Sequence, residues 1–282
     1  MIDLKSMIAQ IDFLTPMPRV VNQVMELADD PDSSLADVAE VIQYDPVITA
    51  NMLKTCNSAY FGLPRVINSI HDATMLLGLD QIVELFIFRC AFENLNQPQE
   101  GYDLKEGELL KQSVASALVS KSIAEILQPP NKHLIFTAAL LKDIGKVVMA
   151  RYVADSFDQI DSMVQNQRLS FIEAEKQVLG LDHAEIGGLI AKRWGFSPLM
   201  TDIIRNHHLI DAAARDDQPT AIVYMADHIC MLLGLCTGAD GMAYQFYDEI
   251  LERLQLTEEM VNTVMVAYLA NRPKVEALMN LS

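Results

Sequence analysis

The segment Asp182-His-Ala-Glu-Ile-Gly-Gly-Leu-Ile-Ala-Lys-Arg-Trp-Gly-Phe-Ser-Pro198 contains the start and stop signals of one helix and the start of the next. Aspartate is a preferred N-cap residue, and glycine readily adopts the left-handed backbone that ends many helices. Asp182 and Gly195 therefore bound a predicted helix from His183 to Trp194. Ser197-Pro198 predicts a second helix that reaches His207-His208, because proline is favoured at the first helical position.

Similar signals divide most of the remaining chain into helices. Asp45-Pro46 predicts a helix to about Asn57, and Pro18 opens another with Val20 on its apolar face. Glycine is sparse, with 12 residues, and the sequence has no alternating strand pattern and no glycine-rich phosphate-binding loop. The fold class is therefore predicted to be all-α. The other expected helices lie near residues 33–42, 67–77, 80–92, 104–127, 134–151, 155–166, 170–179, 219–235, 243–254 and 257–271.

A polar segment interrupts this series of helices once. Residues 94–101 read Asn-Leu-Asn-Gln-Pro-Gln-Glu-Gly, and proline and glycine break regular structure. We predict a linker over residues 95–103. It divides an N-terminal helical lobe, residues 1–94, from a C-terminal helical lobe, residues 104–282.

The composition describes an acidic globular protein. Of the residues, 51% are hydrophobic and 21% charged, and 38 acidic side chains against 21 basic ones give a net charge of −17. Such a surface repels nucleic-acid backbones and anionic membranes. The most apolar stretch, residues 82–92, is too short to span a bilayer. No secretory signal is visible, and the four cysteines lie in apolar helical segments without a CxxC pair. We expect buried, reduced thiols and a cytoplasmic location, with no nucleic-acid or membrane partner.

Five side chains carry the candidate chemistry. His183, His207 and His208 lie at helix ends, Asp143 lies within Leu140-Leu-Lys-Asp-Ile-Gly-Lys146, and Asp227 lies within a later helix. Imidazole and carboxylate groups on separate packed helices are the ligands that a divalent transition metal requires. A metal-activated water can attack a phosphoryl or carbonyl centre. The alternative is that these residues form only structural hydrogen bonds. No role is assigned to His71, His133 or His228.

Several motifs together resemble one family. Residues 140–146 resemble the LLHDIGK core of HD-domain hydrolases, with Lys142 in place of the histidine, and Gln112 stands where the first metal-binding histidine is expected. Residues 183–198, residues 203–208 and Asp227 match the later ligands in order. The N-terminal half is similar to the HD-related output domain (HDOD) family, a signalling branch of the HD superfamily. The matching stretches there are Met17-Pro-Arg-Val20, Tyr44-Asp-Pro-Val47, Cys56-Asn-Ser-Ala-Tyr-Phe-Gly62 and Leu76-Leu-Gly-Leu79.

The resemblance implies a two-lobed helical protein with a degraded metal site. Related binuclear enzymes hold two metal ions, and Gln112 and Lys142 remove both histidines of the first set. We expect the Lys142 ammonium group to lie beside Asp227 or Asp143 in place of that metal. Asp143 and the three later histidines retain the second set, which implies at most one divalent ion. The ligand types do not distinguish iron, manganese, zinc and nickel.

The same resemblance implies a non-catalytic signal-transduction protein that acts by binding a signalling partner or a small molecule. The alternative is a metal-dependent phosphohydrolase acting on a nucleotide or cyclic dinucleotide. The retained ligands favour the alternative, whereas Gln112 and Lys142 disfavour it. The chain also lacks the GYP tripeptide that cyclic-dinucleotide phosphodiesterases carry after the histidine pair, because Leu209-Ile-Asp-Ala follows here.

Overall fold

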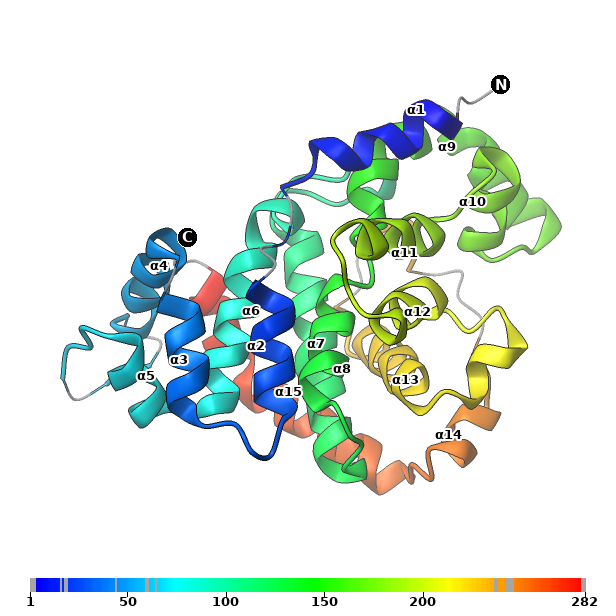
Figure 1. The fold of residues 1–282 in the computed structure, drawn as a ribbon. Coiled ribbons are helices and arrows are strands. Elements are labelled where there is room, and N and C mark those ends of the chain that lie inside the picture. Colours follow the sequence, from blue (N-terminus) through cyan, green and yellow to red (C-terminus); the bar gives the residue numbers. More distant parts are fainter. Residues whose placement is uncertain are drawn as a thin grey trace.

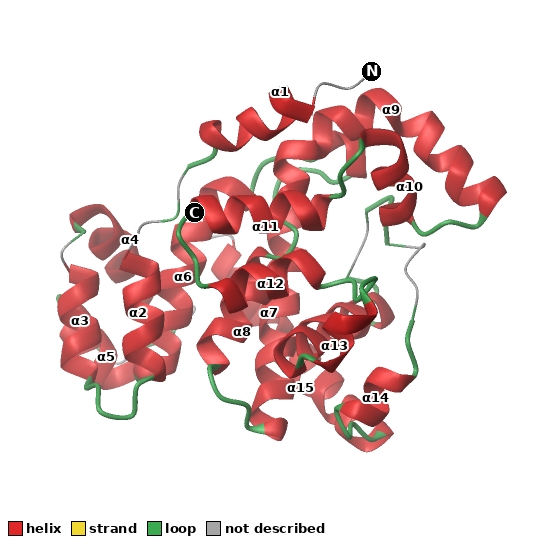
Figure 2. Cartoon of the chain, turned by 45° about the vertical axis from the view of Figure 1, so that its right-hand side comes forward, coloured by secondary structure: helices red, strands yellow, loops and turns green. Residues whose placement is uncertain are grey.

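The computed structural model describes residues 4–15, 17, 20–43, 45–58, 61–63, 65–235, 238–241 and 246–279. Within these ranges the protein consists of helices and connecting loops, and the single β-bridge joins Gln99 to Leu104 (Figure 2). The predicted all-α fold class is confirmed. In the same described ranges, no helix is both long and apolar enough to cross a membrane.

Helices α2 to α6 gather on one side of the molecule, whereas α1 lies apart from them, along the top of the view in Figure 1. Asp45 caps α4 as predicted, because its side chain accepts hydrogen bonds from the backbone N–H groups of Val47 and Ile48. Pro18 lies outside the described residues. The elements are α1 (Leu4–Ala9), the 3-10 helix η1 (Gln10–Phe13), α2 (Val20–Asp29), α3 (Leu35–Gln43), α4 (Pro46–Cys56), α5 (Ile70–Leu77) and α6 (Leu79–Leu95).

The remaining helices form the rest of the molecule, with α7 and α8 at its centre (Figure 1). The long final helix packs back against α7. The elements are the 3-10 helix η2 (Glu100–Tyr102), α7 (Glu108–Leu127), α8 (Lys132–Leu141), α9 (Gly145–Gln167), α10 (Phe171–Leu179), α11 (His183–Arg193), α12 (Pro198–Asn206), the 3-10 helix η3 (Ala212–Asp216), α13 (Gln218–Leu232), α14 (Glu249–Arg253) and α15 (Glu258–Met279).

The predicted helix over residues 134–151 is wrong, because the chain turns at residues 142–144. The backbone N–H of Ile144 bonds the carbonyl of Leu141, and that of Lys146 bonds Asp143, so the hydrogen bonds tighten to three-residue spacing. Helix α9 then continues to Gln167 and includes the segment predicted as a separate helix at 155–166. Apolar periodicity is nearly in phase across the turn, so the sequence pattern did not reveal it.

Several other helix boundaries also differ from the prediction: α7 begins at Glu108 instead of near residue 104, α6 extends to Leu95, and α13 ends at Leu232. Helix α5 begins at Ile70, three residues later than expected, because the backbone of Ile67 bonds the side chain of Asn57 instead. Helix α14 covers only Glu249–Arg253. Helix α15 continues through Pro273 to Met279. Pro273 is exposed, so the carbonyl that loses its helical partner can accept a hydrogen bond from water.

One hydrophobic cluster runs through both halves of the chain, from Met7 to Val275. The segment between α6 and α7 is itself folded, since Gln99 and Leu104 exchange backbone hydrogen bonds of 2.7 and 3.2 Å and Tyr102 is fully buried. The division into two lobes at residues 95–103 stays a prediction. Cys56 and Cys230 are buried and Cys90 is partly buried, all as free thiols, while Cys236 lies outside the described residues.

Candidate metal centre

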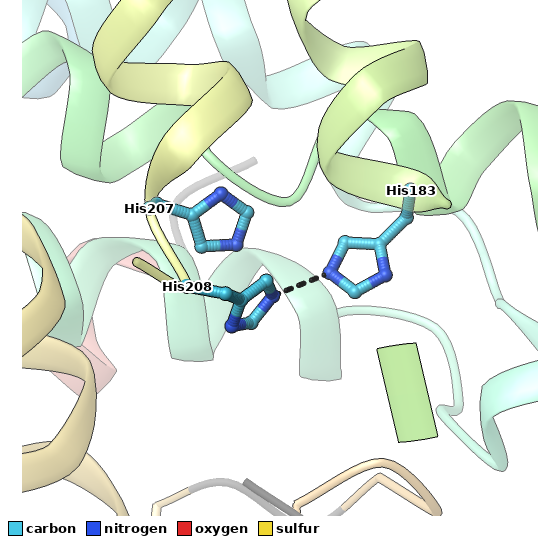
Figure 3. Close-up of side chains that lie close together, drawn as sticks. All are labelled: His183, His207 and His208. Carbon is cyan, nitrogen blue, oxygen red and sulfur yellow. Dashed lines mark hydrogen bonds between the residues drawn. The ribbon is translucent and has the colours of Figure 1, made fainter. Parts of the chain in front are cut away.

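Three histidines from two helices converge in the interior. His183 is the first residue of α11, where Asp182 caps the helix, and His207 and His208 follow the last residue of α12. One ring nitrogen from each lies within 4.8 Å of the others, and all three side chains are buried. Figure 3 shows the rings turned toward one another. The structure therefore brings together the three imidazoles that the sequence predicted as ligands.

Hydrogen bonds at the far side of two rings fix their orientation. Nδ1 of His183 lies 2.8 Å from Oε2 of Glu175, and Nδ1 of His207 lies 2.7 Å from the carbonyl oxygen of Ile204. Both partners accept hydrogen bonds, so both Nδ1 atoms donate and both Nε2 atoms face the centre. Nε2 of His183 is 2.9 Å from Nε2 of His208. Nε2 of His207 is buried without a hydrogen-bond partner among the described residues.

Asp143 lies beside this group, on the turn between α8 and α9. Its Oδ1 is 3.6 Å from Nε2 of His183 and 3.8 Å from Nε2 of His207. The same oxygen is 2.9 Å from Nζ of Lys146 without hydrogen-bond geometry, so it has no hydrogen-bond partner in the described structure. Asp143 thus supplies a buried carboxylate oxygen next to two of the imidazoles.

Two buried lysines also contact Asp143. Nζ of Lys142 contacts Oδ2 of Asp143 and lies 2.8 Å from Oδ1 of Asp227. Nζ of Lys146 lies 2.6 Å from Oδ2 of Asp240, on the loop before α14. Asp227 therefore faces the Lys142 ammonium group and is not part of the convergent histidine group. Gln112 is buried in α7.

Burial and neighbouring charges set the protonation of the site. Burial lowers the pKa of His207 well below its ordinary value, and the Lys142 ammonium group lowers it further. Burial and the two neighbouring imidazoles do the same to the pKa of His208. Burial opposes charge on His183 too, but the Glu175 carboxylate outweighs it and raises the pKa. Burial also opposes charge on Asp143, yet Lys142 and Lys146 hold its pKa well below the usual range. The lowered pKa values keep His207 and His208 neutral and Asp143 ionised, which are the forms that bind metal. The raised pKa of His183 means that its ring holds its second proton more strongly and must lose it to bind metal.

These residues fit one divalent ion. Nε2 of His207 and Oδ1 of Asp143 have no hydrogen-bond partner among the described residues, so both atoms are available as metal ligands. The buried carboxylates Asp143, Glu175, Asp227 and Asp240 also outnumber the buried ammonium groups of Lys142 and Lys146. A divalent cation would balance this excess negative charge. His183, His207, His208 and Asp143 would hold the ion, while Lys142 occupies the space between Asp143 and Asp227.

Three residues of the site, Glu175, Tyr102 and Asp240, were not predicted from the sequence, and Lys146 had no predicted role. Glu175 had a signal that could have found it, since it lies on the apolar face of α10 with Phe171, Ala174 and Leu179. A carboxylate at such a position needs a buried partner. Tyr102 and Asp240 had no comparable signal, because they come from a short connecting segment and a loop.

Comparisons with known proteins show the family of this chain. The sequence profile of the HDOD domain matches residues 14–210. The chain belongs to the HDOD family. Two curated relatives of this HDOD protein are uncharacterized proteins. One, from Treponema pallidum (strain Nichols), is 23% identical over 213 residues, covering 74% of this chain and 40% of its own length. YuxH of Bacillus subtilis (strain 168), an uncharacterized protein, is 26% identical over 186 residues, which cover 62% of this chain and 44% of YuxH. The chain spans less than half the length of either relative.

Solved structures show the same fold. An HDOD domain protein of unknown function from Geobacter sulfurreducens is 24% identical, with a TM-score of 0.73 and 99% of both chains covered. A proposed signal transduction protein from Marinobacter aquaeolei VT8 is 20% identical, with a TM-score of 0.76 over 99% of this chain and 64% of that one. A proposed phosphohydrolase from Shewanella amazonensis SB2B is 20% identical, with a TM-score of 0.69 over 98% of this chain and 97% of that one.

Proposed function

We propose that this HDOD protein is a non-catalytic regulatory module of signal transduction that keeps one transition-metal site in place of a two-metal hydrolytic centre. The observation that carries the proposal is the Lys142 ammonium group, which bridges Asp143 and Asp227. In the binuclear enzymes that the sequence resembles, the corresponding carboxylates hold a metal. An ammonium group supplies positive charge to the same two carboxylates, but it cannot bind and activate a water molecule.

The size of the space beside the imidazoles also supports a non-catalytic role. The cavity that reaches His208, lined also by Tyr224, His228 and Tyr247, has a volume of about 10 Å³. Such a space holds about one water molecule. Ligand pockets usually measure about 300–1,000 Å³. Among the described residues, the side chains around this cavity would have to move before a nucleotide or cyclic dinucleotide reached His208.

The metal's role in this proposal is structural and regulatory. One ion bound by neutral imidazoles and Asp143 would stabilise the packing of α11 and α12 against the turn at 142–144, since binding to the folded state adds to folding stability. Signal output would then depend on a protein partner or a small molecule that recognises the folded surface. The competing function, a metal-dependent phosphohydrolase, is favoured by one observation: the convergence of three buried imidazoles beside Asp143.

Turnover measurements decide between the two functions. The purified protein would be incubated with bis(4-nitrophenyl) phosphate and with cyclic dinucleotides, each in the presence of manganese, iron or magnesium. The expected result is no turnover above that of Asp143→Ala. Robust turnover in the natural sequence that disappears in Asp143→Ala would overturn the regulatory proposal in favour of the hydrolase.

A further inference from the structure

The Glu175 carboxylate forms two hydrogen bonds with His183, one with its ring and one with its backbone. Its side chain is completely buried in α10. Oε2 accepts hydrogen bonds from both Nδ1 and the backbone N–H of His183, each at 2.8 Å. Oε1 accepts a hydrogen bond from the hydroxyl group of Tyr102. One carboxylate therefore binds the ring and the backbone of the same residue, and a second side chain fixes the carboxylate.

The double contact determines which nitrogen of His183 faces the centre. The backbone N–H at the start of a helix has no helical partner, so Glu175 satisfies a group that α11 leaves free. The ring N–H must lie on Nδ1, because the facing oxygen, Oε2 of Glu175, is an acceptor here, as it is for the backbone N–H of the same residue. The lone pair of Nε2 then points toward His208 and Asp143. A carboxylate behind a ligating histidine is a common way to orient the ring and to raise its basicity.

Tyr102 connects this arrangement to another part of the chain. It is fully buried, and its ring lies edge-on to the ring of His183, with 6.0 Å between the ring centres. Its carbonyl oxygen accepts a hydrogen bond of 2.8 Å from the backbone N–H of Ala239, next to Asp240. The segment between α6 and α7 and the loop that carries Asp240 thus meet at the support for His183.

We propose that Glu175, held in place by Tyr102, is a positioning residue for metal binding: it fixes the Nδ1–H form of His183 and so directs Nε2 toward the ion. This inference rests on the single-metal site of the proposed function. It assigns no direct contact between Glu175 and the metal. It also makes Tyr102, from the segment that joins the two halves of the chain, part of the same site.

Cobalt(II) titration tests this role, because the visible spectrum of bound cobalt reports both affinity and coordination geometry. Metal-free natural protein, Glu175→Gln and Tyr102→Phe would be compared. We expect Glu175→Gln to weaken cobalt binding by about 10- to 100-fold and to change the spectrum, with a smaller loss in Tyr102→Phe. The matched control is Glu185→Gln, which removes a carboxylate from α11 itself. Glutamine can still close the capping box with Asp182, so cobalt binding should stay unchanged.

A second measurement keeps the test independent of metal binding. Nitrogen-15 NMR of the imidazole rings, recorded on metal-free protein near pH 8, reports which nitrogen of His183 carries the proton. We expect the Nδ1–H form in the natural sequence and an increased share of Nε2–H in Glu175→Gln. Unchanged affinity, spectrum and ring form in Glu175→Gln would overturn the inference. If the natural protein binds no cobalt, the single-metal site of the proposed function is refuted, and the ring form of His183 still decides the role of Glu175.

Discussion

Nζ of Lys142, on the turn between α8 and α9, lies 2.8 Å from Oδ1 of Asp227 in α13. The same ammonium group contacts Asp143, and the Lys142 side chain is only 4% exposed. The prediction that Lys142 lies beside Asp227 or Asp143 is therefore confirmed for both carboxylates. Because the three charges are buried together, each depends on the others for its stability in the folded protein.

Replacing Lys142 with methionine should destabilise the protein. The change keeps the volume of the side chain but leaves Asp143 and Asp227 without their shared counter-charge. Breaking a buried ion pair in this way lowers the free energy of unfolding by about 3 kcal/mol. Urea denaturation of metal-free protein measures the effect.

The control for this variant is Lys176→Met. Lys176 pairs with Glu185 at 2.7 Å, but its side chain is 52% exposed, so the pair contributes less than about 1 kcal/mol. An equal loss of stability in the two variants would show that the buried bridge has no special role.

Restoring both missing histidines should create room for a second ion. In the double variant Gln112→His and Lys142→His, the ammonium group between Asp143 and Asp227 is replaced by a neutral metal ligand. The metal content per chain, measured by atomic emission after dialysis, should rise from about one toward two. The single variant Gln112→His keeps Lys142 and should stay at the value of the natural protein. A double variant that binds no additional metal would contradict the idea that Lys142 substitutes for an ion.

Gly145 should not tolerate a side chain. A Cβ atom there would lie 1.9 Å from the backbone oxygen of His183 and 2.8 Å from the backbone nitrogen of Gly187. Since both neighbours are backbone atoms of α11, Gly145→Ala must push α9 away from the helix that carries His183. We expect the free energy of unfolding to fall by about 3 kcal/mol, measured by urea denaturation.

Gly195→Ala separates this clash from backbone strain. Gly195 has a φ of +77° but nothing within 4 Å of an added Cβ atom. Only the left-handed backbone opposes the change there, at about 1 kcal/mol. If the free energy of unfolding fell by the same amount in Gly145→Ala and Gly195→Ala, the result would argue against the close approach of α9 and α11.

His133 should contribute to the attachment of the N-terminal helices. Its Nδ1 lies 2.8 Å from Oδ1 of Asp29 in α2, and its Nε2 lies 3.2 Å from Oδ1 of Asp80 in α6. His133→Ala removes both contacts from a buried position and should lower the free energy of unfolding by about 2 kcal/mol. The exposed His71 provides the control, since His71→Ala should change stability by less than about 0.5 kcal/mol. If the two variants were equally stable, the bridge would have no energetic role.

The sequence alone determined the helices whose ends are fixed by local hydrogen bonds. Asp45, Asp182 and Ser197 each cap the helix that was predicted to follow them. Such caps involve residues two or three positions apart, so a short stretch of sequence contains all the information. The order of the motifs around Asp143, His183 and His207 likewise identified the family, which the match over residues 14–210 shows.

Only the tertiary structure decided how the charged groups pair and which residues support the site. Lys142 contacts Asp227, which is distant in the sequence. Glu175, which accepts hydrogen bonds from Tyr102 and His183, is hidden in an apolar pattern. The turn at Lys142 is hidden in the same way. The distances between these residues depend on how α9, α10, α11 and α13 pack. Packing follows from the burial of many side chains at once, and no single motif determines it.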